Sequence, residues 1–242
     1  GKLMDIDFMR YYPWGFENLV DFKLLGYAIA YLYKFLNFFD SSVTVGYAQV
    51  LYPPFAFVIG LIFFFLLVRK IFDYRIAIVS SLLLTIIPPY LFRTISGVGD
   101  KEALGMVFFF AALYFFVLGW KSEKLKKSLT FGVLSGLSTA LMGLVWGGYA
   151  FHVSIIGLTG LISFVFLKFK REFFFTYCSW YALFYLMMIL FRNYHLNNII
   201  GAYFGAVATA PLFSGLFNFL ILKYKLEEKI ENKTKLPHKI FS

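Results

Sequence analysis

Two carboxylates and one arginine lie close together in the segment Arg93-Thr-Ile-Ser-Gly-Val-Gly-Asp100-Lys-Glu102, which follows one apolar run and precedes another. Its glycines allow backbone conformations that other residues avoid. If the segment is extended, Asp100 and Glu102 point the same way, because side chains repeat every two residues in such a backbone. Two converging carboxylates suit a hard divalent cation such as Mg²⁺ or Mn²⁺. Arg93 could hold a phosphate or a carboxylate with its planar guanidinium.

The same residues also fit a structural role. Asp100 could cap a helix that begins near Lys101, and Glu102 would then interact favourably with the helix dipole. Within a helix, side chains two positions apart diverge by about 200° around the axis. Arg93 could simply extend from the membrane face into water. The spacing alone leaves both interpretations open.

The composition as a whole indicates a membrane protein. Of 242 residues, 60% are hydrophobic, and the mean hydropathy is +0.74. A soluble domain of this length could not bury so much apolar surface. We therefore predict an all-α membrane protein that folds as a polytopic bundle of transmembrane helices. The single cysteine, Cys178, excludes an intramolecular disulfide.

Seven apolar runs can serve as spans, each of which needs roughly 20 residues of helix. They cover about 44–68, 76–91, 103–120, 128–146, 149–167, 173–191 and 199–222. Residues 1–43 are expected to form an external loop with an amphipathic helix at the membrane interface, between Asp21 and Asp40. An eighth span is the alternative there, disfavoured by the charge of Lys34 in mid-stretch. Residues 223–242 are expected to form a basic cytoplasmic tail.

Positive charge alternates along the connections between these runs. Lysine and arginine gather in the first, third and fifth connections, at Arg69, Lys70, Arg75, Lys121, Lys124, Lys126, Lys127, Lys168, Lys170 and Arg171, and again in the tail. The positive-inside rule makes these connections cytoplasmic and places Asp100 and Glu102 outside. The net charge of +10 is therefore a topology signal, and no nucleic-acid partner is expected.

Four segments together resemble a known family. The segment 93–102 resembles the second-loop acidic motif of the catalytic subunits of oligosaccharyltransferases, which are membrane glycosyltransferases of the GT-C class. Asp7-Phe-Met-Arg-Tyr-Tyr-Pro13-Trp-Gly15 resembles the first-loop Tyr-Pro-x-Gly segment of archaeal members. Asp73-Tyr74-Arg75 leads into a span that ends in Pro and Arg, and Trp146-Gly147-Gly148-Tyr149 resembles a turn between two later spans. The resemblance covers most of residues 1–170, in order and with matching sidedness.

The resemblance implies a GT-C type bundle of about seven spans and a function. Members transfer a glycan from a polyprenyl (pyro)phosphate lipid, such as a dolichyl carrier, to the asparagine of an Asn-x-Ser/Thr acceptor polypeptide, assisted by Mn²⁺ or Mg²⁺. By position, Asp100 and Glu102 would be catalytic metal ligands. Arg93 would orient these carboxylates or the lipid phosphate. The candidates for substrate contact are Trp146, Tyr149 and Asp7.

Other parts expected from the family are not found in this sequence. They are the first helix with its acidic loop residue, a later external loop with a glutamate, and the soluble domain with Trp-Trp-Asp-Tyr-Gly. We therefore expect the N-terminal membrane portion of a larger protein, inactive alone, from the cell membrane of an archaeon. The alternatives are another GT-C transferase that uses a polyprenyl-phosphate sugar, a transporter, or a non-catalytic membrane subunit. Transport is disfavoured because the predicted spans contain no Asp, Glu, Lys or Arg.

Overall fold

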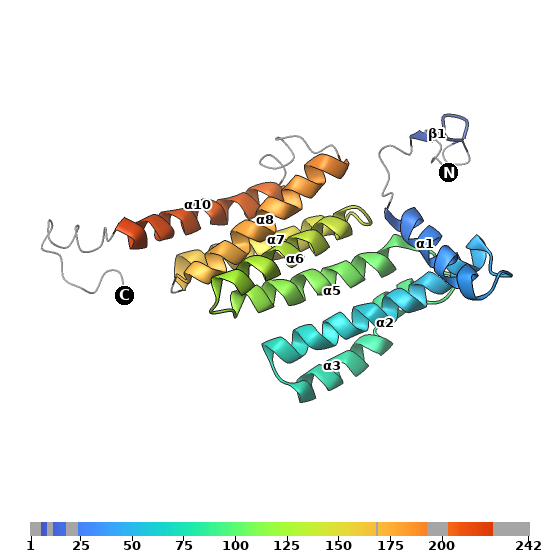
Figure 1. Cartoon of the computed structure of the whole chain (residues 1–242), viewed down its shortest axis with the longest axis horizontal. Helices are drawn as coiled ribbons and strands as arrows, with labels where there is room; N and C mark the ends of the chain where they lie inside the picture. Colours follow the sequence, from blue (N-terminus) through green and yellow to red (C-terminus); the bar gives the residue numbers. More distant parts are fainter. Residues whose placement is uncertain (1–5, 9–11, 18–23, 168, 193–202, 225–242) are drawn as a thin grey trace, which may run out of the picture.

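In the computed structural model the chain is a bundle of roughly parallel and antiparallel helices with one short hairpin (Figure 1). The structure describes residues 6–8, 12–17, 24–167, 169–192 and 203–224. The helices are α1 (Leu24–Phe39), α2 (Val45–Ile71), α3 (Tyr74–Ile86), α4 (Pro88–Thr94), α5 (Lys101–Trp120), α6 (Leu125–Gly143), α7 (Tyr149–Phe166), α8 (Arg171–Arg192) and α10 (Tyr203–Tyr224). The two-residue strands β1 (Ile6–Asp7) and β2 (Phe16–Glu17) pair antiparallel. The predicted class, an all-α membrane bundle, is confirmed.

Helices form in each of the seven predicted spans. Five described helices, α2, α5, α7, α8 and α10, are long and apolar enough to cross a membrane, and α3 with α4 makes a sixth candidate as a bent pair. Helix α6 is not among them, because it is rich in Ser, Thr and Gly and carries Lys126 and Lys127. The number of spans therefore stays a prediction. Most of the predicted basic tail, 225–242, lies outside the described residues.

The span predicted at 76–91 is broken by its prolines. Helix α3 ends before Ile87, which has an extended backbone, and α4 then runs through Pro88 and Pro89 to Thr94 at an angle of 67° to α3. A proline restrains the residue before it and suits the first turn of a new helix, where no N–H is needed. The break changes the direction of the chain, and Arg93 in the last turn of α4 therefore lies at the end of the bundle.

The helix α6 lies at the centre, between α5 and α8 (Figure 1). Small residues let it approach α8 closely. A Cβ added at Gly132 would lie 2.5 Å from the backbone oxygen of Thr176, and one at Gly136 would lie 2.6 Å from that of Trp180. This is the small-xxx-small spacing by which membrane helices pack without a hydrophobic driving force.

Two polar side chains of α6 form hydrogen bonds with neighbouring helices. The Thr139 hydroxyl accepts the indole N–H of Trp180 at 3.0 Å and lies 3.2 Å from His152 Nε2. Ser135 Oγ donates to the backbone oxygen of Ala112 on α5 at 2.8 Å. Because neighbouring helices cover these groups, the least apolar helix can occupy the most buried place.

The basic connections lie together at one end of the bundle. Lys121 Nζ donates to the backbone oxygen of Lys70 at 2.7 Å, which joins the α2–α3 and α5–α6 connections. At the opposite end, the N–H of Gly97 bonds the backbone oxygen of Val50 at 3.1 Å. The charge alternation found in the sequence thus corresponds to two ends of one bundle. Which end faces the cytoplasm stays a prediction.

The helix predicted between Asp21 and Asp40 is present as α1. Its inner face places Leu25, Ile29 and Leu32 against a buried cluster of Tyr52, Ala56, Ala103 and Val107 from α2 and α5. Its other face exposes the aromatic residues Tyr27, Tyr31, Phe35, Phe38 and Phe39. At 16 residues α1 is shorter than a span, so the predicted interfacial position fits its length and its exposed rings.

Candidate functional site

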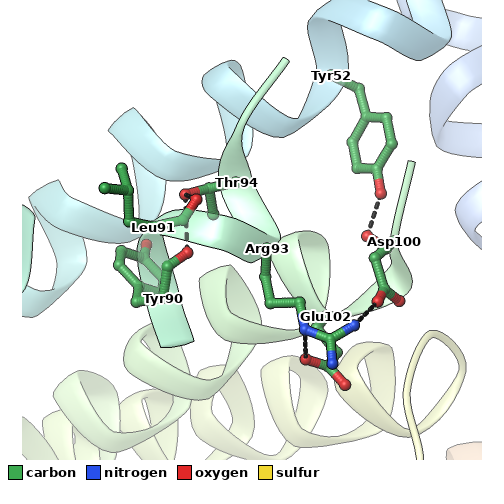
Figure 2. A network of polar contacts seen from close by, with 7 residues as sticks. All are labelled: Tyr52, Tyr90, Leu91, Arg93, Thr94, Asp100 and Glu102. Atoms are coloured by element: carbon green, nitrogen blue, oxygen red, sulfur yellow. Dashed lines mark hydrogen bonds and ion pairs between the residues drawn. The ribbon is translucent and has the colours of Figure 1, made fainter. Parts of the chain in front are cut away.

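The Arg93 guanidinium bridges the two carboxylates of the acidic segment (Figure 2). Its Nη1 donates to Asp100 Oδ2, and its Nε lies 3.0 Å from Glu102 Oε2. The three side chains come from the last turn of α4, the residue before α5 and the first turn of α5. Both carboxylates therefore face one guanidinium group.

The backbone that achieves this differs from the predicted one. An extended backbone through both acids is wrong, because α5 begins at Lys101 and Glu102 already lies in its first turn. Asp100 alone is extended, with φ −88° and ψ 141°, and its side chain makes no capping bond. The divergence expected for two helical positions does not arise, since Asp100 precedes the helix and Arg93 reaches both side chains.

The loop that carries Asp100 is fixed to α2. Gly97 N–H and Ser96 Oγ each donate to the backbone oxygen of Val50 at 3.1 Å. The Tyr52 hydroxyl donates to the backbone oxygen of Asp100 (Figure 2). Gly97 has a φ of +88°, a conformation that side chains disfavour, and it thereby allows the turn. The anchoring residues on α2 were not predicted from the sequence.

The side chains of the cluster are accessible to solvent. The side chain of Arg93 is 49% exposed, that of Asp100 25% and that of Glu102 29%. Arg93 and the adjacent Lys101 balance the formal charges of Asp100 and Glu102, so the site has two carboxylates among two basic groups. Exposed ion pairs of this kind contribute only about 0–1 kcal/mol, so a ligand can replace them at small cost.

The donor chemistry fits part of a site for a hard divalent cation. Carboxylate oxygens are preferred ligands of Mg²⁺ and Mn²⁺, and Arg93 engages one oxygen of each acid. Across the described ranges, no group of three or more His, Cys, Asp or Glu side chains is placed to hold a metal ion. Asp100 and Glu102 can therefore supply a partial ligand set, to be completed by groups from elsewhere.

Comparison with known proteins decides the family. A family profile described as "Oligosaccharyl transferase STT3, N-terminal" matches residues 2–235. The chain belongs to the STT3 family. Among relatives, subunit STT3B of the rice (Oryza sativa subsp. japonica) dolichyl-diphosphooligosaccharide–protein glycosyltransferase is 24% identical over 226 residues, 92% of this chain and 30% of the relative. The stt-3 subunit of Caenorhabditis elegans is 28% identical over 119 residues, 49% of this chain and 15% of the relative. The chain thus spans less than a third of the length of these relatives.

Solved structures of the Archaeoglobus fulgidus oligosaccharyltransferase share the fold. The form tethered to an acceptor peptide containing the NVT sequon has a TM-score of 0.72 at 22% identity, over 98% of this chain and 29% of that one. The complex with Zn and sulfate has a TM-score of 0.69 at 20% identity, over 94% and 30%. The complex of AglB with an inhibitory peptide and a dolichol-phosphate has a TM-score of 0.70 at 19% identity, over 99% and 29%. STT3 membership separates the chain from the other GT-C transferase families.

Trp146 and Tyr149 act as packing residues in this STT3 chain. A Cβ added at Gly105, one turn after Glu102, would lie 3.0 Å from Trp146 Cε3, so the indole covers the start of α5. Tyr149 is 6% exposed, and its ring packs against Phe184. Both residues thus support the helix starts beside the acidic loop. Their contact with substrate stays a prediction.

The first-loop segment of the STT3 chain includes Asp7 of β1 and Gly15, which directly precedes β2 of the hairpin. Asp7 pairs through its backbone register with Phe16, while its side chain lies outside the described part of the structure. Gly15 has a φ of +75°, and a Cβ there would lie 2.6 Å from Ile6 Cγ2. A glycine is therefore required at this turn. The predicted substrate contact of Asp7 stays a prediction.

Proposed function

We propose that this chain is the N-terminal membrane portion of an oligosaccharyltransferase catalytic subunit. The full protein would transfer a glycan from a polyprenyl (pyro)phosphate lipid, such as a dolichyl carrier, to the asparagine of an Asn-x-Ser/Thr acceptor. One observation carries this proposal: Arg93 gathers the carboxylates of Asp100 and Glu102 into one solvent-accessible cluster at the end of the bundle opposite the basic connections. The Archaeoglobus complexes with dolichol-phosphate and with a sequon peptide support it.

Each side chain of the cluster has a distinct role in this proposal. Asp100 and Glu102 would hold a divalent cation, Mn²⁺ or Mg²⁺, through carboxylate oxygens. When bound, such a cation supplies charge stabilisation to a leaving phosphate. Arg93 keeps the two like-charged carboxylates together and has further N–H donors to offer a phosphate oxygen. The Archaeoglobus complex with Zn supports a divalent cation in this family.

The position of the cluster suits a lipid-linked substrate. It lies where α4 ends and the apolar helix α5 begins. A polyprenyl tail could stay in the bilayer beside the apolar helices while its phosphate reaches the cluster in water. We place this end on the non-cytoplasmic face of an archaeal cell membrane, since the basic connections gather at the other end.

The test is transfer by the complete gene product, given a lipid-linked glycan and an Asn-x-Thr peptide. Asp100→Ala is expected to lower turnover on the order of 100-fold or more, the cost of removing one charge-stabilising group from such a site. Its Mn²⁺ affinity should fall with turnover, while its thermal unfolding should stay close to that of the wild type.

Asp73→Ala provides the matched control. Asp73 also precedes a helix, where its carboxylate accepts the backbone N–H groups of Arg75 and Ile76 at 2.8 and 2.9 Å, but it lies among the basic connections. Loss of this cap costs about 1 kcal/mol of stability and should leave turnover unchanged. Wild-type turnover in Asp100→Ala would contradict the proposal.

A further inference from the structure

The backbone oxygen of Val50 holds the loop that carries Asp100, although it lies inside a helix. It accepts both the N–H of Gly97 and the hydroxyl of Ser96. Within a regular α-helix such an oxygen accepts the N–H four residues later, which occupies one of its two lone pairs. At Val50 both bonds come from the loop, and the sequence of α2 explains why no intrahelical donor takes part.

A proline pair frees this oxygen. The α-helical donor to Val50 would be residue 54 and the 3₁₀ donor residue 53, and both are prolines, which have no N–H. The preceding carbonyl, that of Gln49, also loses its α-helical donor, but its 3₁₀ donor Tyr52 retains an N–H. The carbonyl of Val50 is the one deprived of both intrahelical donors.

The freed oxygen takes its partners from the acidic loop. Backbone carbonyl groups of folded proteins are nearly always hydrogen-bonded, and here the loop provides the donors that the helix lacks. The loop 95–100 supplies two donors to Val50. In a third bond, the Tyr52 hydroxyl of α2 donates to the backbone oxygen of Asp100 in the loop (Figure 2). The side chain of Gln49 also packs on Gly99, where an added Cβ would lie 3.0 Å from its Nε2. Gln49, Val50 and Tyr52 of α2 thus contact the loop at several points between Ser96 and Asp100.

We propose that Pro54, acting with Pro53, is a positioning residue of the acidic site. By removing the donor to Val50, it makes α2 the anchor of the loop and fixes Asp100 relative to Arg93. The proline touches neither carboxylate and works only through the loop. Its effect on turnover rests on the proposed function, whereas the anchoring itself can be measured without turnover.

The anchoring is tested by hydrogen exchange of the Gly97 amide in the complete protein. Pro54→Ala restores an N–H at the α-helical position, which competes with the loop for the Val50 oxygen. Exchange at Gly97 is expected to become about 5- to 10-fold faster, the factor that corresponds to roughly one hydrogen bond. Pro211→Ala makes the same change inside α10 and should leave Gly97 unaffected. Unchanged exchange at Gly97 in Pro54→Ala would overturn the proposal.

A second variant tests the same oxygen without altering α2. Ser96→Ala removes the other donor from the exposed loop and should also speed exchange across 95–100. Because both variants act on one carbonyl, their combined effect should be smaller than the product of the single effects. If the double variant speeds exchange by the full product of the two single factors, the proposal is overturned, because Pro54 and Ser96 would then act on different groups.

Turnover measurements separate the proposal for the loop anchor from the proposal for the acidic site. If the acidic site is correctly assigned, Pro54→Ala should lower kcat about 10-fold without a matching rise in KM for the peptide, as expected for a misplaced catalytic group. If Pro54→Ala speeds exchange at Gly97 but turnover is unchanged in both Pro54→Ala and Asp100→Ala, the anchor is supported and the assignment of the site is rejected. Loss of turnover in Asp100→Ala alone, with unchanged exchange in Pro54→Ala, would reject the anchor and sustain the site.

Discussion

Arg93 determines how the two carboxylates are held. Without it, Asp100 and Glu102 would face one another as like charges. The ion pairs are half exposed on the arginine side, so they contribute little to stability. Their effect is geometric, because a planar guanidinium can bond two carboxylates in a fixed relation.

Arg93→Lys separates geometry from charge. The ammonium of lysine keeps the positive charge but lacks the planar fork that reaches both acids. We expect turnover of the complete protein to fall about 10-fold, the scale seen when a supporting contact of a metal ligand is lost. The free energy of unfolding should change by less than about 0.5 kcal/mol.

Arg75→Lys, at the basic end of the bundle, is the control for that change. Arg75 lies beside the ring of Tyr74, far from the acidic loop along α3 and α4, and its replacement should preserve turnover. Equal turnover in Arg93→Lys and the wild type would show that charge alone suffices at this position.

At the scale of elements, α6 organises the bundle through close contact. The hydropathy of its sequence is the lowest among the predicted spans, yet it lies between α5 and α8. Glycine removes the side-chain volume that would separate helices, and the hydroxyl groups of Ser135 and Thr139 form hydrogen bonds with a carbonyl of α5 and the indole of Trp180. Its burial therefore follows from size and hydrogen bonding more than from apolarity.

Gly132→Ala should disrupt this contact. Its added Cβ would lie 1.9 Å from Ser179 Oγ and 2.5 Å from the backbone oxygen of Thr176, and backbone cannot move aside as a side chain can. We expect a loss of about 1–3 kcal/mol in the free energy of unfolding, measured by thermal or denaturant unfolding in detergent.

The matched change is Gly26→Ala on α1, where an added Cβ meets nothing within 4 Å. Alanine favours a helix over glycine by up to about 1 kcal/mol, so this variant should be equally stable or more stable. If both variants lose a similar free energy of unfolding, the destabilisation by Gly132→Ala does not arise from the contact between α6 and α8.

At the scale of the whole molecule, the bundle has two chemically different ends. Basic connections join at one end through Lys70 and Lys121, while the acidic cluster and its anchor lie at the other. The proposed function requires the second end to face away from the cytoplasm, where the glycan and the acceptor would meet.

Cysteine labelling in intact cells tests this orientation. In a Cys178→Ala background, Val98→Cys lies in the acidic loop and Glu123→Cys in the exposed α5–α6 connection. A membrane-impermeant maleimide should modify position 98 in intact cells and position 123 only after permeabilisation, by the positive-inside rule. The reverse pattern would place the acidic cluster in the cytoplasm and contradict the proposed function.

Several features were determined by the sequence alone. Runs of apolar residues predicted a helix in every span, and charge alternation predicted the two ends. The convergence of Asp100 and Glu102 was also predicted, but from an extended backbone that is present only at Asp100. These features depend on residues close together in the chain, which hydropathy and local backbone preferences describe well.

Only the tertiary structure decided what holds the site. The partner of both carboxylates, the anchor at Val50 and the support of Trp146 on Gly105 are contacts between different helices or loops. The proline pair at 53 and 54 shows in sequence that a carbonyl lacks its helical donor, but it does not show which segment will bond that oxygen. That choice depends on how α2, α4 and α5 pack, because a hydrogen bond between residues nearly fifty positions apart forms only when helix packing brings them together.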